Sequence, residues 1–309
     1  MENREIFGTE VVEGEKIFHS IFDPLNDQSE PITELWVDIP KNFDHNQLGP
    51  LTFQSPLQKK SKTIGTWLTR HFFLFDKYLV YGNSPDPKKI TKYLKLNGMK
   101  VIVSCLTDNS KNGSDKGQIV FFRSGTYFKL YTADHDLALK WREHLKKSCI
   151  MINFYRMYTV IKLLGKGSYG RVFLVERQSD KRQFAVKVLD KVKLLSHLKG
   201  IECLSNEINI LRTINHDSIL GLEEVYESSS SVYLVLEYVE GGELATRLHE
   251  KGKLKEATAL TLMKNILESV AFLHSKNIIH RDLKPENILM QSRLDDTCIK
   301  IADFGLALR

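Results

Sequence analysis

Three glycines with the spacing G-x-G-x-x-G, set between two β-like runs, place the tightest constraint on this chain of 309 residues. The run Gly165-Lys166-Gly167-Ser168-Tyr169-Gly170 follows the apolar stretch 158–164 and precedes the apolar stretch 172–175, so the glycines join two strands. A dinucleotide-binding fold would need a helix directly after the same motif. Since glycine lacks a Cβ, the backbone N–H groups of such a turn can approach phosphate oxygens. The pattern predicts a phosphate-holding turn, with an ordinary hairpin as the alternative.

A lysine and a glutamate further along predict a buried ion pair. Lys187 lies in the apolar run 183–189, and a buried ammonium group needs a partner. Glu207 lies in a segment whose apolar residues Leu204, Ile208 and Leu211 recur at helical spacing. We therefore expect the Glu207 carboxylate to project from a helix toward Lys187. The alternative is that both residues are ordinary surface charges.

Two later motifs complete an ordered series, and with them the chain resembles the eukaryotic protein kinase family over residues 158–309. They are His280-Arg281-Asp282-Leu283-Lys284-Pro285-Glu286-Asn287 and Asp303-Phe304-Gly305. The resemblance implies a bilobal fold and transfer of the γ-phosphoryl group of ATP to a protein hydroxyl. Lys284 resembles the residue found in serine/threonine rather than tyrosine kinases, with a solvated loop lysine as the alternative.

The resemblance assigns roles residue by residue. Lys187 would hold the phosphates once Glu207 fixes it, Asp282 would accept the substrate proton, and Lys284 would lie by the γ-phosphate. Asn287 and Asp303 would bind Mg²⁺. Glu243 and Glu286 match positions that present carboxylates to a basic substrate sequence, although Glu243 could equally bind the ribose. The expected ATP-binding residues are Leu164, Gly165, Lys166, Gly167, Ser168, Tyr169, Gly170, Val172, Ala185, Lys187, Leu236, Glu237, Val239, Glu243 and Leu289.

The sequence stops at Arg309, shortly after Asp303-Phe304-Gly305, whereas kinases of this family continue through an activation segment and further helices. We expect a complete N-lobe and an incomplete C-lobe. The apolar stripe Met263, Ile266, Leu267, Val270 and Leu273 would then lack cover. The alternative function is accordingly a catalytically incompetent regulatory fragment that binds ATP or lipid.

Charge is unevenly distributed upstream of the kinase motifs. Residues 1–54 hold 3 Lys+Arg against 11 Asp+Glu, and residues 55–148 hold 18 against 7. A middle region this basic predicts an anionic partner. We expect no nucleic-acid partner.

Residues 55–150 alternate short β-like runs with turns and end in the helical segment 134–147, which contains Trp141. This pattern predicts a small antiparallel β-barrel or sandwich closed by one helix, and therefore an α+β multidomain protein. With Trp67 and Arg70 near its start, the region resembles a pleckstrin-homology domain. That resemblance implies a phosphoinositide or anionic-membrane site at Lys59, Lys60, Lys62 and Arg70. Leu68 departs from the basic residue of strong lipid binders, so a protein-binding module stays open.

The remaining features concern the amino-terminal residues, the compartment and the subfamily. Residues 1–54 are acidic, with scattered apolar residues, and we expect them to be mostly irregular and to cover the basic domain electrostatically. No stretch has the apolar length of a bilayer-spanning helix, and the isolated cysteines agree with a reduced compartment, so we expect a cytoplasmic protein recruited peripherally to membranes. The domain order resembles the protein kinase B group, whereas His280 resembles the calmodulin-dependent group.

Overall fold

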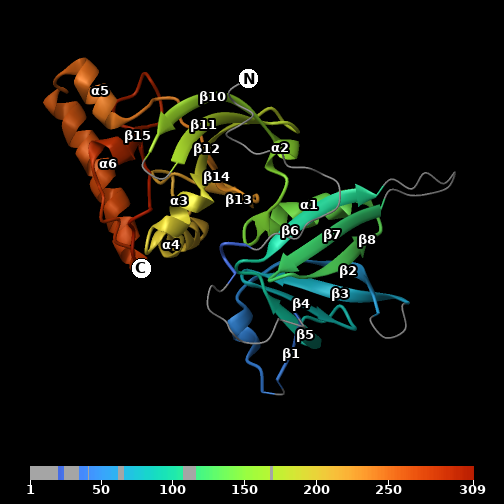
Figure 1. The fold of residues 1–309 in the computed structure, drawn as a ribbon. Helices are drawn as coiled ribbons and strands as arrows, with labels where there is room; N and C mark the ends of the chain where they lie inside the picture. The colour runs from blue at the N-terminus through green and yellow to red at the C-terminus, as the bar shows by residue number, and fades with distance from the viewer. Residues whose placement is uncertain (1–19, 24–34, 41, 62–65, 107–115, 168–169) are drawn as a thin grey trace. The chain divides into compact units, whose positions relative to one another are not determined.

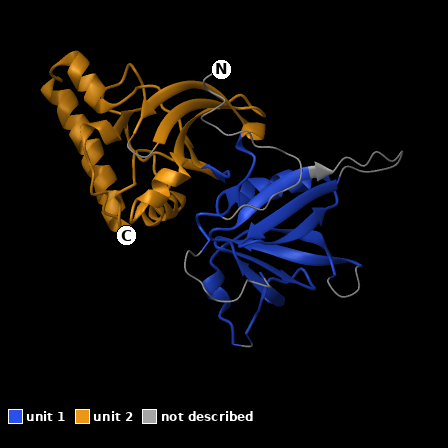
Figure 2. Ribbon diagram, in the orientation of Figure 1, with its two compact units in different colours: residues 1–154, 226–230 blue, residues 155–225, 231–309 orange. Residues whose placement is uncertain are grey.

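A computed structural model of the chain describes residues 20–23, 35–40, 42–61, 66–106, 116–167 and 170–309. The chain divides into two compact units (Figure 2). The N-terminal unit comprises residues 1–154 with 226–230, and the C-terminal unit comprises residues 155–225 with 231–309. No helix among the described residues is long and apolar enough to cross a membrane.

The N-terminal unit is built on an antiparallel sheet with one long helix, α1 (His135–Leu145) (Figure 1). Its strand order is β1-β5-β4-β3-β2-β8-β7-β6-β9; among the described residues β9 pairs with β6 in parallel, and the other neighbours in this order pair antiparallel. The strands are β1 (Val37–Asp38), β2 (Leu51–Lys60), β3 (Trp67–Phe75), β4 (Tyr78–Gly82), β5 (Ile90–Lys95), β6 (Lys100–Leu106), β7 (Lys116–Arg123), β8 (Thr126–Thr132) and β9 (Ile150–Met151).

Helix α1 closes one side of this sheet. Asp134 caps its first turn by accepting a hydrogen bond from the Leu137 amide at 2.6 Å. Ala138, Trp141 and Leu145 recur at helical spacing and are fully buried. The indole of Trp141 donates to the Ser55 hydroxyl at 2.8 Å, so its one polar atom is also satisfied. The helix predicted around Trp141 is therefore present, with its apolar face against the sheet.

A second apolar cluster lies on the strands β3 and β4. Leu48, Phe73, Phe75 and Val80 form its buried part, and Phe43 packs against them. Leu48 belongs to the 3-10 helix η1 (His45–Leu48), so part of the first 54 residues packs onto the sheet. These elements left no periodic signal in the sequence, because β1 spans 2 residues and η1 spans 4. Most of the acidic region expected to be irregular lies outside the described residues.

The C-terminal unit begins with a sheet of strand order β13-β14-β12-β11-β10 (Figure 1). The helix α4 accompanies this sheet, and the helices α5 and α6 form a second lobe with the small β15-β16 sheet. The elements are α2 (Phe154–Met157, which begins in the N-terminal unit), β10 (Tyr158–Lys166), β11 (Gly170–Arg177), β12 (Gln183–Asp190), α3 (Lys191–Ser196), α4 (Gly200–Thr213), β13 (Leu222–Glu227, whose last two residues belong to the N-terminal unit), β14 (Ser231–Glu237), α5 (Leu244–Lys251), α6 (Glu256–Ser275), η2 (Pro285–Asn287), β15 (Ile288–Met290) and β16 (Ile299–Ile301).

Helix α6 buries only part of the apolar stripe expected to lack cover. Ile266 and Leu273 are buried, and Val270 is half-buried. Met263 and Leu267 are 53% and 60% exposed. The stripe is therefore split, because its buried residues face their own lobe while more than half of the surface of Met263 and of Leu267 is exposed.

Candidate active site

The glycine turn joins β10 to β11, as the flanking β-like runs predict. The Gly167 amide donates to the Gly170 carbonyl at 2.9 Å and closes the turn. A Cβ on Gly170 would lie 2.0 Å from the Val188 carbonyl oxygen, so only glycine fits there. A Cβ on Gly165 would meet nothing within 4 Å. The turn thus has open space beside its backbone, while Ser168 and Tyr169 lie outside the described residues.

Strand register places several expected nucleotide-binding residues on one face of the sheet. Val172 lies opposite Lys187, and Ala185 lies opposite Leu236. Ala185 and Lys187 are two positions apart on β12, so their side chains point to the same side. The four residues therefore form one surface, which runs from the glycine turn toward the end of β14.

The expected adenine-binding segment follows this surface. The Glu237 amide already donates to the Gly221 carbonyl at 2.9 Å. Val239 is half-buried in the link between β14 and α5. Glu243 and Leu289 form a β-bridge with each other, which joins this link to β15. Leu164 and Lys166, on β10, have exposed side chains.

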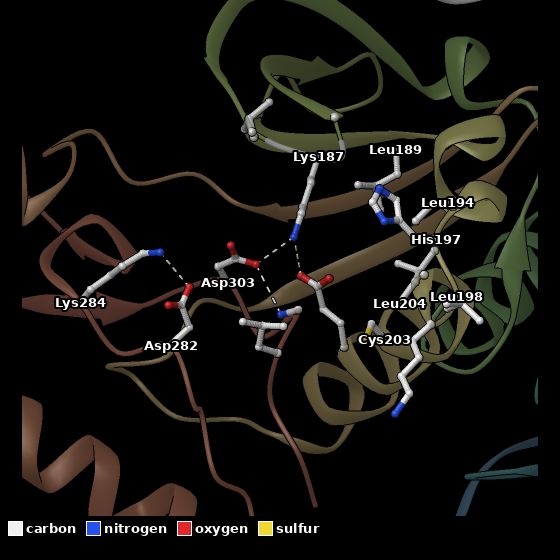
Figure 3. A pocket seen from close by; sticks show the side chains of 18 residues that line it. Lys187, Leu189, Leu194, His197, Leu198, Cys203, Leu204, Asp282, Lys284 and Asp303 are labelled. Carbon is white, nitrogen blue, oxygen red and sulfur yellow. Dashed lines mark hydrogen bonds and ion pairs between the residues drawn. The ribbon is translucent and has the colours of Figure 1, made fainter.

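Lys187 lies between two carboxylates (Figure 3). Its Nζ is 2.8 Å from Glu207 Oε1, on α4, and 3.0 Å from Asp303 Oδ1. The predicted Lys187–Glu207 ion pair is confirmed. Burial alone would lower the pKa of Lys187, but the carboxylates of Glu207 and Asp303 outweigh burial and raise it, so the ammonium form is held.

The two carboxylates around Lys187 respond differently to the same ammonium group. Burial raises the pKa of Glu207, and Lys187 offsets only part of that effect. Burial also acts to raise the pKa of Asp303, but Lys187 and the Gly305 amide reverse the direction and lower it. Of the two carboxylates, Glu207 is therefore the first to take up a proton as the pH falls.

Asp282 accepts hydrogen bonds from two residues of its own loop. Lys284 Nζ is 2.9 Å from Asp282 Oδ2, and Asn287 Nδ2 donates to the same oxygen at 2.9 Å. The bond from Lys284 holds the pKa of Asp282 below its ordinary value. The pKa of Lys284 rises for the same reason. The carboxylate is thus ionised at neutral pH and its orientation is set by neighbours.

His280 ties the Asp282 loop to the Asp303 segment. Its Nδ1 accepts from the Asp282 amide at 3.3 Å, which places the ring proton on Nε2, 3.0 Å from the Ala302 carbonyl oxygen. The Ala302 amide in turn donates to the Asn287 carbonyl at 2.9 Å. His280 is 4% exposed. Its role in this structure is to hold two backbone segments together.

Asn287 and Asp303 offer oxygen ligands of the kind that Mg²⁺ prefers. The Asn287 amide nitrogen donates twice to Asp282, which leaves the amide oxygen as the atom suited to a metal. Asp303 Oδ1 accepts from Lys187 and from the Gly305 amide, so Oδ2 is the Asp303 oxygen suited to a metal. No cluster of three or more His, Cys, Asp or Glu side chains suited to a metal occurs among the described residues. A cation here would therefore need oxygens from a ligand as well.

A cavity of about 680 Å³ opens beside these groups (Figure 3). The expected site residues that line it are Gly167, Gly170, Val172, Lys187, Glu207, Asp282, Lys284 and Asp303. It also reaches a region between α3 and α4 that sequence reasoning missed, lined by Leu194, His197, Leu198 and Cys203. No motif marks these four residues. The expected adenine contacts Leu236, Glu237 and Val239 do not line it.

The expected lipid-binding residues are only partly brought together. Lys59 Nζ donates to the Tyr81 hydroxyl at 2.9 Å and lies 4.2 Å from the centroid of the same ring. Arg70 donates to the Thr69 carbonyl at 2.9 Å, and Lys60 has an exposed side chain. Lys62 lies outside the described residues. Lys59 is therefore engaged with an aromatic ring of the sheet.

Comparison with known proteins agrees with the geometry of the C-terminal unit. Residues 158–309 match the protein kinase domain family. The chain is 40% identical over 157 residues to myosin light chain kinase A of Dictyostelium discoideum, covering 51% of this chain and 52% of that protein. It is 44% identical over 152 residues to calcium/calmodulin-dependent protein kinase type 1 of Caenorhabditis elegans, covering 48% of this chain and 42% of that protein.

A third relative, calcium-dependent protein kinase 5 of Plasmodium berghei, is 40% identical over 170 residues, which are 54% of this chain and 30% of that protein. The chain thus spans about half the length, or less, of these curated relatives. Between the two groups that the sequence resembled, the relatives favour the calmodulin-dependent one, as His280 indicated. Residues 158–309 are a serine/threonine protein kinase domain, homologous to the calcium/calmodulin-dependent kinases.

Proposed function

We propose that the protein transfers the γ-phosphoryl group of ATP to a serine or threonine hydroxyl of a protein substrate. The observation that carries this proposal is the convergence of Lys187, Glu207 and Asp303 on one side of a cavity whose lining also includes Asp282 and Lys284. These groups hold a triphosphate, neutralise it and accept a proton. Little else is required, because phosphoryl transfer depends mainly on positioning and electrostatic stabilisation.

Each of the candidate site residues has a defined task in this mechanism. The backbone of the glycine turn and the Lys187 ammonium group bind the phosphates, with Glu207 fixing the ammonium position. Asn287 and Asp303 would hold Mg²⁺, which would neutralise charge on the phosphates. Asp282 Oδ accepts the proton of the attacking hydroxyl, and Lys284 lies within reach of the transferred group. The lowered pKa of Asp282 keeps this carboxylate in the form that accepts a proton.

The test measures binding and transfer on one preparation. Isothermal titration with MgATP reports binding, and ³²P transfer to a basic serine peptide reports catalysis. Lys187→Met should abolish binding, whereas Glu268→Gln, an exposed change on α6, should alter neither signal. Binding without transfer in the unmodified chain would favour the alternative of an ATP-binding regulatory fragment, and absence of binding would refute the proposal.

We also propose a preference for basic residues near the target hydroxyl. Glu243 and Glu286 both have exposed side chains and lie beside the catalytic segments. Each carboxylate could pair with an arginine of a substrate peptide. Glu243→Gln and Glu286→Gln should raise KM for an arginine-containing peptide and leave KM for its alanine version unchanged. Equal effects on both peptides would contradict this preference.

For the N-terminal unit we propose a pleckstrin-homology-like module that binds anionic lipid headgroups and recruits a cytoplasmic protein to membranes. The supporting observations are the excess of 18 Lys+Arg over 7 Asp+Glu in residues 55–148 and an antiparallel sheet covered by α1. Lys60 and Arg70 lie on the neighbouring strands β2 and β3. Liposome sedimentation with and without phosphoinositides tests it, with Lys60→Ala/Arg70→Ala as the variant and Lys140→Ala on α1 as the control. Equal liposome binding by the two variants would place the lipid contact at other residues. Absence of liposome binding by the native chain would refute the lipid-binding proposal.

A further inference from the structure

A short segment of the amino-terminal region, Ser20–Asp23, is docked onto the N-terminal unit. Ile21 is 7% exposed, and Phe22 lies against Gly98, where an added Cβ would be 3.4 Å from the Phe22 carbonyl oxygen. The Asp23 carboxylate accepts hydrogen bonds from the Ser124 amide at 3.3 Å and from the Ser20 amide at 3.1 Å. The segment therefore has a defined conformation and defined contacts with the β7–β8 turn.

The strongest contacts of this segment are with one buried carboxylate. Glu227 is fully buried, and it belongs to residues 226–230, which are part of the N-terminal unit (Figure 2). The Ser20 hydroxyl donates to Glu227 Oε2 at 2.6 Å, and the Ile21 amide donates to Oε1 at 2.9 Å. Both carboxylate oxygens thus hold the segment. Charge-assisted bonds of this kind are about twice as strong as neutral ones.

We propose that Ser20 is a phosphorylation site that releases the Ser20–Asp23 segment from Glu227. Phosphorylation would form an Oγ–P bond as the bond to the γ-phosphorus of ATP breaks, with ADP leaving and the hydroxyl proton passing to the base of the donor kinase. The product carries roughly two negative charges where the structure has a hydroxyl donor. That donor is lost, and the phosphate meets a carboxylate in a site that excludes water, so the docked state becomes unfavourable.

The burial of Ser20 determines the order of events. Its residue is 6% exposed, so a kinase reaches the hydroxyl in the undocked state. Phosphorylation then keeps the segment undocked, because the phosphorylated form has lower affinity for the Glu227 site. Ser20 therefore controls whether the Ser20–Asp23 segment is docked on Glu227.

Backbone amides of the full chain provide the test. Hydrogen exchange with residue-level fragmentation follows the Ile21 amide, which bonds Glu227, and the Ser124 amide, which bonds Asp23. The chain carrying phosphoserine at position 20, and Ser20→Glu, should speed exchange of both amides at least tenfold. Ser20→Ala, which removes the hydroxyl's bonds to Glu227 and from the Phe22 amide without adding charge, should have a clearly smaller effect. Ser229→Glu adds the same charge at an exposed position of the β13–β14 turn and should change exchange less than twofold.

A Glu227→Gln background separates charge repulsion from a general loss of packing. In the Glu227→Gln background, Ser20→Glu should raise the exchange rates of the Ile21 and Ser124 amides by less than threefold. Unchanged exchange in the phosphoserine chain would overturn the proposal, and so would equal effects of Ser20→Ala and Ser20→Glu. If Glu227→Gln fails to fold, as judged by tryptophan fluorescence, the comparison of Ser20→Glu with Ser20→Ala and Ser229→Glu still decides the outcome.

Discussion

Replacing Lys187 by methionine removes the ammonium group that lies between Glu207 and Asp303. The Glu207 side chain is 6% exposed, so its carboxylate stays buried without a counter-charge when the lysine goes, whereas the Asp303 side chain is 50% exposed and keeps contact with water. At 2.8 Å and an effective dielectric constant of about 20, the Lys187–Glu207 attraction is about 6 kcal/mol. Desolvation of both groups offsets much of this value. We expect Lys187→Met to destabilise the C-terminal unit by about 3 to 5 kcal/mol.

A double-mutant cycle isolates the pairwise interaction. Lys187→Met, Glu207→Gln and the double variant should yield a coupling free energy of about 2 kcal/mol, within the range for contacting residues. The matched control is the surface pair Lys264–Glu268 on α6, with atoms 3.8 Å apart and side chains 71% and 62% exposed. For that pair, Lys264→Met with Glu268→Gln should give a coupling below about 0.5 kcal/mol.

The assay must report the C-terminal unit separately. The three tryptophans, Trp36, Trp67 and Trp141, all lie in the N-terminal unit, so their fluorescence serves as an internal control. Urea-dependent hydrogen exchange of peptides from β12 and α4 measures the unit that contains Lys187. A coupling energy equal to that of the Lys264–Glu268 control would refute the reasoning, because it would mean that the ion pair contributes no more than an exposed one.

Three further predictions concern catalysis, packing and pH. Asp282→Asn should lower phosphoryl transfer by about 100-fold or more while MgATP affinity changes less than threefold, and a parallel loss of affinity would argue against proton acceptance by Asp282. Arg247 is 6% exposed and bonds Asp296 at 2.6 Å and two carbonyl oxygens, so Arg247→Met should cost about 3 kcal/mol of unfolding free energy in urea titrations. Lys251→Met, which removes the 44% exposed partner of the same carboxylate, should cost less than about 1 kcal/mol, and equal costs would contradict the burial argument. Because the pKa of Glu207 is raised from 4.5, its carboxylate takes up a proton at a higher pH than usual, whereas Asp303 stays ionised to lower pH. As the pH is lowered, the MgATP affinity measured by titration should therefore begin to fall while the pH is still above 4.5. Glu207→Gln should bind MgATP more weakly at neutral pH but should lack this acidic decline. If the variant shows the same pH dependence as the native chain, the decline belongs to another group.

Much of the kinase domain could be predicted from local sequence. The glycine turn, the strand carrying Lys187 and the helix carrying Glu207 each have a periodic or glycine-based signal within a few residues. Short β-like runs between turns likewise predicted β3 and β4, and helical spacing predicted α1. No such run marks β2, because Pro56 and a largely polar sequence interrupt it, although the strand pairs with both β3 and β8.

Sequence by itself determined which chemical groups the protein has and the order in which they occur: the glycines, Lys187, Glu207, Asp282, Asn287 and Asp303, and the separation of acidic from basic regions. Only the tertiary structure decided which of these groups meet. Lys187 and Asp303 are 116 positions apart, and Ser20 and Glu227 are 207 apart, so no local pattern encodes either contact. The same holds for Lys59, whose amine lies against Tyr81. Local propensities act over a few residues, whereas the burial and pairing of charges depend on chain segments that approach each other only in the folded state.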